Sequence, residues 1–418
     1  MLDIHDLHVA LDSESGIVRA IEALSLAIAR GETFALVGES GCGKSMTALA
    51  LMRLLPENGR ITAGRIELEG ADMLALPESQ MRAVRGGRIG MIFQEPATSL
   101  NPVMKVGDQL LEAIQTHTPL RGAAACAKAI EWLRRVGIPE PERRIDDYPF
   151  RMSGGQKQRV MIAMTLATEP DFLIADEPTT ALDVTIQAQI LDLLRELQRE
   201  QGMGLMLITH DLAVVSGMAQ RVALMYAGQI VEVATAEEFF SSPKHPYAQA
   251  LLRALPDAQR RGEPLAAIAG TVPAMTQSFT GCRFAPRCAS AMAHCASTLP
   301  ALTALTATRS VRCLLYTDAN REPTVVVPLP ALAAQVQRAA APVRPLLDVK
   351  DLRVRFPIRK GLLQRVAGHF EAVAGVSFAI GAGRTLALVG ESGCGKTTAG
   401  KAIVQLLRHQ AAIDGEAL

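Results

Sequence analysis

The chain has 418 residues, 49% of them hydrophobic, which is enough to bury the cores of two or three domains. Its 43 basic and 42 acidic residues leave a formal net charge of +1, so no overall field would draw it to nucleic acid or to an anionic membrane. No apolar run of about 18 residues appears, and no basic region precedes an apolar one at the N-terminus, so we expect a cytoplasmic chain that reaches a membrane only through a partner.

The first predicted elements are a strand at residues 2–9 and a buried strand at residues 33–37, which leads into a glycine-rich loop. The loop matches the pattern G-x-x-x-x-G-K-[ST], in which backbone N–H groups and the start of the next helix bind phosphate oxygens. A glycine-rich turn with a solvated lysine is the alternative. We predict that ATP is bound by Gly38, Glu39, Ser40, Gly41, Cys42, Gly43, Lys44 and Ser45.

Three further runs are strand-like, at residues 88–93, 172–175 and 205–209. Between the last two runs, five apolar side chains share one helical face: Ile186, Ile190, Leu193, Leu194 and Leu197. This alternation of buried strands and amphipathic helices predicts an α/β fold, with a mainly parallel sheet covered by helices.

Two adjacent carboxylates, Asp176 and Glu177, stand at the end of the strand-like run 172–175. In an ATP site such a pair suits Mg²⁺ and water: Asp176 would hold the metal together with Ser45, and Glu177 would polarise the water that attacks the γ-phosphate. A buried strand followed by a solvated acidic turn is the alternative for this segment taken alone.

A second module repeats the beginning of the first. Residues 347–354 echo residues 2–9, and an insertion around residues 358–368 precedes a second apolar run at residues 385–389, which we predict to be a buried strand. The second phosphate loop predicts further ATP-binding residues: Gly390, Gly393, Gly395, Lys396 and Thr397. The segment 347–418 is too short to complete a sheet of this kind and would leave strand edges open, so we expect either a truncated module or one that another chain completes. Its own ATP site cannot be complete.

Four more motifs make the first module resemble the ATP-binding cassette (ABC) ATPases. They are similar to the Q-loop glutamine (Gln94), the signature loop (residues 152–156), the D-loop (residues 181–183) and the switch histidine (His210), and they occur in the family's order. The signature and D-loop residues that we carry over are Ser153, Gly154, Gly155, Gln156 and Asp183.

The resemblance implies a P-loop ATPase fold with a helical signature subdomain, in which ATP is sandwiched between two modules. It implies that Ser153 faces the γ-phosphate held by the opposite module and that His210 contacts the γ-phosphate beside Glu177. Gln94 would contact Mg²⁺ and the attacking water, and would line a groove that receives a transporter helix.

Three stretches, at residues 93–102, 245–252 and 281–288, resemble the oligopeptide/dipeptide importer subfamily. The resemblance implies an ATPase subunit at the cytoplasmic face of the bacterial inner membrane. Its partners would be integral membrane permease subunits, a second cassette in a homodimer or heterodimer, and indirectly an extracytoplasmic substrate-binding protein, with no nucleic acid. The alternative function is a soluble tandem cassette ATPase that acts on nucleic acid or ribosomes, although such proteins usually carry a basic linker.

The domains that follow from these motifs are a first ATPase domain, a Cys-rich extension, a Pro/Ala-rich linker and part of a second ATPase domain fused in tandem. Their expected bounds are 1–255, 256–320, 321–346 and 347–418.

Four cysteines of the extension have the spacing C-x5-C-x6-C-x17-C: Cys282, Cys288, Cys295 and Cys313. An odd total of seven cysteines in an untargeted chain argues against a disulfide framework, and the spacing lacks the C-x2-C pairs of structural zinc sites. Four thiolates can hold a [4Fe–4S] cluster, and the resemblance to the importer subfamily implies such a cluster here. Zinc in a Cys₄ site and four unligated buried thiols remain the alternatives.

Overall fold

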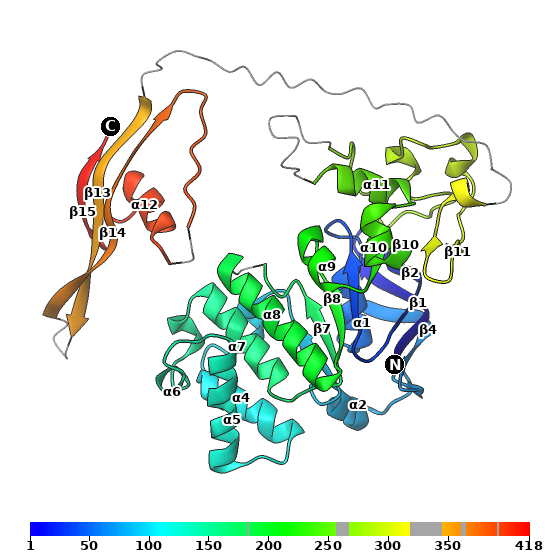
Figure 1. Cartoon of the computed structure of the whole chain (residues 1–418), viewed down its shortest axis with the longest axis horizontal. Helices are drawn as coiled ribbons and strands as arrows, with labels where there is room; N and C mark the ends of the chain where they lie inside the picture. The colour runs from blue at the N-terminus through cyan, green and yellow to red at the C-terminus, as the bar shows by residue number, and fades with distance from the viewer. Residues whose placement is uncertain (181, 183, 256–266, 318–344, 361–364, 391–392) are drawn as a thin grey trace. The chain divides into compact units, whose positions relative to one another are not determined.

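The computed structural model describes residues 1–180, 182, 184–255, 267–317, 345–360, 365–390 and 393–418, which form two compact units (Figure 1). The larger unit is built mainly from the chain up to residue 317, and the smaller unit mainly from residues 345–418. No helix in the described ranges is both long enough and apolar enough to cross a bilayer.

An antiparallel sheet begins the larger unit. Its strand order is β2-β1-β4-β5, and alternate side chains of β1, such as Leu2 and Ile4, are buried beneath it. These strands are β1 (Leu2–Ser13), β2 (Gly16–Ile28), β4 (Gly59–Leu68) and β5 (Ala71–Asp72). The predicted strand at residues 2–9 is therefore confirmed as part of β1.

A second sheet of eight strands forms the centre of the larger unit, in the order β11-β12-β10-β9-β3-β8-β7-β6. From β9 to β6 the neighbours are parallel, whereas β10, β12 and β11 add to the β9 edge in antiparallel pairs. The strands are β3 (Thr33–Val37), β6 (Ile89–Ile92), β7 (Phe172–Asp176), β8 (Gly204–Ile208), β9 (Arg221–Tyr226), β10 (Gln229–Thr235), β11 (Thr303–Ala304) and β12 (Ser310–Val311).

Every residue of β3, β6, β7 and β8 is buried, as expected for parallel strands that are covered on both faces. The expectation of a mainly parallel sheet is therefore confirmed for these strands, while the β10-β12-β11 edge makes the sheet mixed. Because β12 lies within residues 256–320, the segment expected to be a Cys-rich extension shares this sheet with strands of the expected first domain, residues 1–255.

Helices cover both faces of the eight-stranded sheet. α1 (Lys44–Leu51) contributes to the core that the two sheets share, and α9, α10 and α11 pack around a second core on the other side. A separate helical group, α3 to α7, packs around α7 (Figure 1). The remaining bounds are α2 (Glu78–Val84), α3 (Pro96–Ser99), α4 (Val106–His117), α5 (Gly122–Arg135), α6 (Pro141–Arg144), α7 (Gly154–Leu166), α8 (Val184–Gln201), α9 (Leu212–Met218), α10 (Ala236–Ser241) and α11 (Pro246–Arg253).

The apolar face predicted around residues 186–197 forms on α8. Ile190, Leu194 and Leu197 are each at most 1% exposed, and Leu193 is 7% exposed. Ile186, at the beginning of the helix, is only half-buried.

The smaller unit is a three-stranded antiparallel sheet, in the order β14-β13-β15, on which α12 packs. Its elements are β13 (Pro345–Lys360), β14 (Arg365–Gly381), α12 (Lys396–Ile403) and β15 (Ala412–Ala417). The insertion expected around residues 358–368 lies at the end of the β13–β14 hairpin, which extends further than the β1–β2 hairpin.

The strand predicted at residues 385–389 is wrong. These residues form no strand, and Val389 is 83% exposed. The equivalent β3 is buried because β8 and β9 pair with it on both sides, and the described part of the smaller unit provides no such neighbours.

Candidate active site

The phosphate loop lies between β3 and α1, and its backbone passes very close to neighbouring strands. Gly43 caps α1 with a φ of +109°, and a Cβ atom there would lie 2.5 Å from the carbonyl oxygen of Ala20 and 2.7 Å from Cε of Met225. Gly41 also has a positive φ, of +79°. Such left-handed turns let successive backbone N–H groups converge on an anion, so the loop has the geometry of a phosphate site.

Lys44 closes this loop. Its side chain is buried, and Nζ donates to the carbonyl oxygens of Gly38 at 2.8 Å and of Glu39 at 3.0 Å. The ammonium group is therefore held beside the loop and can exchange these carbonyl partners for phosphate oxygens.

Asp176, the last residue of β7, is 3% exposed. Burial raises the pKa of its carboxyl group, and a hydrogen bond with Ser45 offsets only part of that effect. Its Oδ1 is buried and has no hydrogen-bond partner. A buried carboxylate oxygen is costly without a partner, and a divalent cation would satisfy it.

Ser45, Gln94 and Asp176 line one cavity of about 470 Å³. The three predicted Mg²⁺ ligands thus converge, although they come from α1, the segment after β6 and the end of β7. A hydroxyl, an amide oxygen and a carboxylate are hard oxygen donors, so the residues fit a magnesium ion.

Glu177 is the centre of a hydrogen-bonded group that contains all three predicted catalytic residues. Nδ1 of His210 donates to Oε1 of Glu177 at 3.0 Å, and Nε2 of Gln94 donates to Oε2 at 3.4 Å. Thr180, which sequence reasoning missed, donates its hydroxyl to the same Oε2 at 2.9 Å. The structure therefore brings Gln94, Glu177 and His210 together at the ends of three parallel strands.

The state of this carboxylate suits a general base. Burial raises the pKa of Glu177, but the hydrogen bonds from His210 and Thr180 outweigh burial, so the net shift is downward and Glu177 is ionised at neutral pH. Its backbone has a φ of +50°, an unusual value for glutamate, and its N–H donates to the carbonyl oxygen of Ile208 at 2.9 Å. A strained backbone fixed in this way is typical of functional positions.

The predicted signature loop forms the N-terminus of α7. Ser153 is the N-cap and makes a capping box with Gln156: the N–H of Gln156 donates to Oγ of Ser153 at 3.3 Å, and the N–H of Ser153 donates to Oε1 of Gln156 at 3.0 Å. Ser153 and Gly154 are exposed, and Gly155 is half-buried. The N-terminus of α7 is thus open to solvent, and a helix N-terminus attracts anions in general.

A buried side chain joins this helix to the catalytic strand. Gln158 is fully buried, and its Nε2 donates to the carbonyl oxygen of Pro178 at 2.6 Å. Pro178 follows Glu177 directly, so this hydrogen bond links the position of α7 to that of Glu177. Sequence reasoning missed Gln158 because a lone glutamine on a helix gives no signal of its own. Asp183 of the predicted D-loop lies outside the described residues.

The second phosphate loop, in the smaller unit, has a similar start to its helix. Gly395 caps α12 with a φ of +94°, and Nζ of Lys396 donates to the carbonyl oxygen of Gly390 at 2.6 Å. Gly393 also has a positive φ, of +88°, and Thr397 lies in the first turn of α12.

The four cysteines of the extension meet at one small cavity of about 10 Å³, which His245 also lines. Burial raises the pKa of the thiols of Cys282, Cys288 and Cys313, to about 11 for Cys288 and about 12 for Cys313. Among the described residues, no three His, Cys, Asp or Glu side chains have the arrangement of a metal site. Four cysteine thiols are the donor type that an iron–sulfur cluster requires, but their arrangement among the described residues is not that of a metal site.

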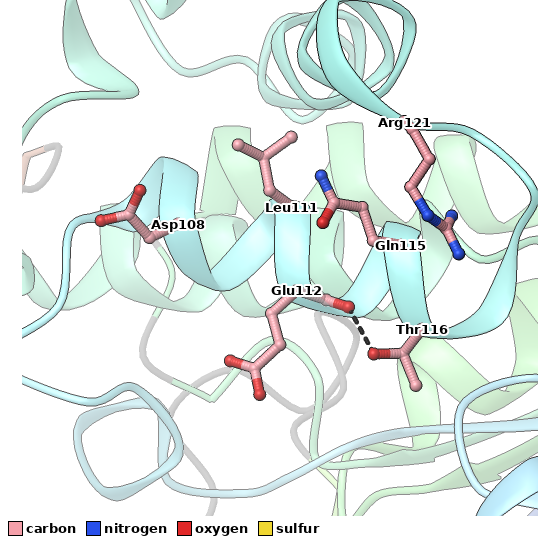
Figure 2. A pocket seen from close by; sticks show the side chains of 6 residues that line it. All are labelled: Asp108, Leu111, Glu112, Gln115, Thr116 and Arg121. Carbon is pink, nitrogen blue, oxygen red and sulfur yellow. Dashed lines mark hydrogen bonds between the residues drawn. The ribbon is translucent and has the colours of Figure 1, made fainter.

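Another hollow, of about 550 Å³, lies on the helical group and contains none of the predicted ATP-site residues. Figure 2 shows its side chains: those from Asp108 to Thr116 lie on α4, and Arg121 lies on the segment that follows it. The hydroxyl of Thr116 donates to the carbonyl oxygen of Glu112 at 2.7 Å. The lining is Asp108, Leu111, Glu112, Gln115, Thr116 and Arg121.

Two family models match this chain. The model described as "ABC transporter" matches residues 21–180 and 373–417, and the model described as "Oligopeptide/dipeptide transporter, C-terminal region" matches residues 231–295.

Curated relatives are similar over most of their length. The chain is 48% identical over 315 residues to a probable peptide ABC transporter ATP-binding protein of Sinorhizobium fredii, covering 75% of this chain and 94% of the relative. It is 46% identical over 325 residues to the dipeptide transport ATP-binding protein DppD of Escherichia coli, covering 78% and 99%. Among solved structures, the dimeric ATP-binding cassette MJ0796 bound to ADP and Pi aligns with a TM-score of 0.52 and 26% identity, covering 56% of this chain and 99% of that one.

Proposed function

This chain belongs to the ABC transporter ATPases of the oligopeptide/dipeptide importer type, and we propose that it is the ATP-hydrolysing subunit of an importer for peptides. The observation that carries the proposal is the group formed by Glu177, His210 and Gln94 beside the Ser45–Asp176 cavity. The names of the relatives support peptide import, and they give no support to the alternative of an ATPase that acts on nucleic acid.

In the proposed reaction, residues 38–45, which include Lys44, bind the phosphates of ATP, and Ser45, Gln94 and Asp176 would hold Mg²⁺. When bound, this ion would supply positive charge that offsets the negative charge of the phosphates. Glu177 accepts a proton from the attacking water, and His210 holds the Glu177 carboxylate in place from Oε1.

We propose that the open N-terminus of α7 completes the ATP site of another cassette. Supporting observations are the exposure of Ser153 and Gly154 and the dimeric state named for the solved cassette MJ0796. The partner cassette is a second copy or a separate subunit, and Asp183 would lie at the same interface. We therefore expect the hydrolysis rate per chain to rise steeply with protein concentration; a rate that is independent of dilution would contradict this.

Residues 347–418 are proposed to be the N-terminal part of a second cassette, fused in tandem through the linker 321–346. Support comes from the family match at residues 373–417, from the hairpin β13–β14, which repeats β1–β2, and from the shared geometry of Gly43 and Gly395. In this scheme, residues 1–255 are the first ATPase domain, residues 256–320 are its Cys-rich extension, and Gly390, Gly393, Gly395, Lys396 and Thr397 bind a second ATP.

The proposed location is the cytoplasmic face of the bacterial inner membrane, where the chain is bound to permease subunits that receive peptide from an extracytoplasmic binding protein. The cavity beside Gln94 would receive a permease helix, because Met91, Phe93 and Met161 give it an apolar wall.

For the four-cysteine cavity we propose an iron–sulfur cluster, supported by four sulfur donors around one cavity. Anaerobic purification followed by iron, acid-labile sulfide and zinc analysis decides between the three alternatives. A chain with iron and sulfide supports the cluster, one with zinc alone supports a Cys₄ site, and one with neither leaves buried thiols.

The proposed function is tested by uptake of a radiolabelled dipeptide in a strain that lacks this gene. Complementation with the wild-type chain should restore uptake, and complementation with Lys44→Ala should not, although the protein is present at the same level. Equal restoration by both forms would refute the proposal.

A further inference from the structure

Glu39, the second residue of the phosphate loop, is anchored at three points. Its N–H donates to the hydroxyl of Tyr247 at 3.1 Å, and its carbonyl oxygen accepts from Lys44. Its carboxylate accepts from NH1 of Arg287, at 3.0 Å for Oε1 and 3.1 Å for Oε2. Two of the three anchors, Tyr247 and Arg287, come from the C-terminal part of the larger unit, more than 200 residues further along the chain.

Arg287 is itself rigidly held. It ends a short 3₁₀ turn, Ala285–Arg287, and its side chain is only 6% exposed. Its guanidinium also donates to the carbonyl oxygens of Ala269 at 2.9 Å and Ile268 at 3.5 Å, and to the hydroxyl of Tyr226 at 3.3 Å. A guanidinium fixed by several acceptors loses little freedom on pairing, so it can fix the position of the carboxylate that it faces.

The same segment also supports the loop from a second direction. Arg283 pairs with Glu22 and donates to the carbonyl oxygen of Ala227. The next residue, Gly228, donates its N–H to the carbonyl oxygen of Cys42 in the phosphate loop at 2.9 Å. Residues 282–288 therefore contact the loop directly at Glu39 and indirectly at Cys42.

We propose that Arg287 is a positioning residue for ATP binding, which holds the phosphate loop in its binding conformation through the carboxylate of Glu39. The inference rests on the proposed function of residues 38–45 as an ATP site. The extension thereby has a role in ATP binding. Its turn at residues 285–287 raises the affinity for nucleotide through Arg287, although Arg287 does not contact the phosphates.

The test measures the Kd of the full chain for a fluorescent, non-hydrolysable ATP analogue with Mg²⁺, together with the thermal midpoint. Arg287→Gln should raise the Kd about tenfold, which is ~1.4 kcal/mol. Glu39→Met should also raise the Kd, because the loop loses the same anchor. The Kd of the double variant should not exceed that of the single variant with the higher Kd, because both substitutions remove the same interaction.

The sign of the Glu39→Met effect separates positioning from charge. If Arg287 acted only by neutralising a carboxylate near the phosphates, removing that carboxylate would tighten ATP binding. Tighter binding by Glu39→Met, or a Kd within twofold of wild type for Arg287→Gln, overturns the inference.

A matched control is Arg312→Gln. Arg312 also belongs to the extension and donates to backbone carbonyl oxygens, at 2.9 Å for Ile230 and 3.3 Å for Pro300. Within the described part of the chain its side chain makes no hydrogen bond to the phosphate loop. We expect it to lower the thermal midpoint without changing the Kd. A Kd that rises equally in Arg312→Gln and Arg287→Gln would show general destabilisation and refute a specific role for Arg287. Wild-type protein that binds no nucleotide would instead refute the proposed function itself.

Discussion

The substitution Glu177→Gln should separate ATP binding from ATP hydrolysis. Glutamine has the shape of glutamate and keeps one oxygen that can accept from His210 or Thr180, so the local packing should survive. It cannot take up the proton of the attacking water at neutral pH. Because Lys44 and Asp176 are unchanged, the chain should still bind Mg-ATP.

The size of the effect follows from the role of this carboxylate. A positioned general base contributes about 10²- to 10⁴-fold to a rate, which corresponds to ~2.7–5.4 kcal/mol of transition-state stabilisation. The net lowering of the pKa of Glu177 places the base in its active, ionised form at neutral pH, so the full loss should appear there. We therefore expect turnover to fall at least a hundredfold.

The assay is phosphate release at saturating Mg-ATP over a series of protein concentrations, with the Kd of the ATP analogue measured in parallel. Glu169→Gln is a matched control, because Glu169 also has a positive φ, of +53°, and its carboxylate pairs with Lys128 at 2.8 Å away from the site. The control should keep wild-type turnover. More than a tenth of wild-type turnover in Glu177→Gln, with ATP still bound, would refute the assignment of Glu177 as the base.

Three further predictions concern stability. Gly43→Ala should lower the thermal midpoint of the nucleotide-free chain more than Gly41→Ala. Both positions have a positive φ, which costs ~1–2 kcal/mol for alanine. Only a Cβ at residue 43 would clash, because it would lie 2.5 Å from the carbonyl oxygen of Ala20. An equal loss would mean that the clash relaxes. Ser153→Ala should cost ~1 kcal/mol in urea unfolding by removing the cap of α7, and Ser153→Thr should cost less. Burial lowers the pKa of His245 to about 3 in the folded chain, whereas its value in the unfolded chain is about 6.5. The free energy of unfolding should therefore hold the full contribution of neutral His245 above about pH 6.5. Below that pH it should fall by up to ~1.4 kcal/mol per pH unit. His245→Asn should remove that slope, and a slope that persists would exclude His245 as its source.

The grouping of the candidate ATP-site residues could be predicted from sequence because these residues follow short, local patterns. A buried strand followed by a glycine-rich loop places Lys44 next to Ser45, and the apolar run of β7 places Asp176 and Glu177 at the edge where parallel strands end. His210 follows β8, the neighbour of β7, so it reaches the same edge. Local pattern and sheet order together define this group.

The contacts that support the site could not be predicted in the same way. Arg287 and Glu39 are 248 residues apart, and nothing in either segment indicates the other. Thr180 and Gln158 act through single hydrogen bonds, to a side chain and to a backbone carbonyl, which leave no periodicity in the sequence. These residues become visible only when the fold brings distant segments together.

The failed strand at residues 385–389 shows the limit of apolar patterns. Its sequence is nearly that of β3, yet β3 is a strand because β8 and β9 provide hydrogen-bond partners on both sides. An apolar run provides the burial energy for a parallel strand but not its ladder. Secondary structure at this position is therefore a property of the sheet and not of the segment.

The N-terminus of α7 provides an independent physical reason for a partner cassette. The capping box uses Oγ of Ser153 and the N–H of Gln156, which stabilises the helix, but it leaves the N–H groups of Gly154 and Gly155 in the first turn. Apart from its chain neighbours and the backbone of α7 itself, no heavy atom of the described residues lies within 4 Å of the position where a Cβ of Gly154 would be, so this end of the helix can be approached closely from outside. An exposed helix N-terminus with two glycines favours an anion. The carboxylate of Glu177 is not that anion, because it is hydrogen-bonded to Gln94, Thr180 and His210. In the proposed arrangement this anion is the terminal phosphate of a nucleotide on another cassette, and hydrolysis is then expected to require two cassettes.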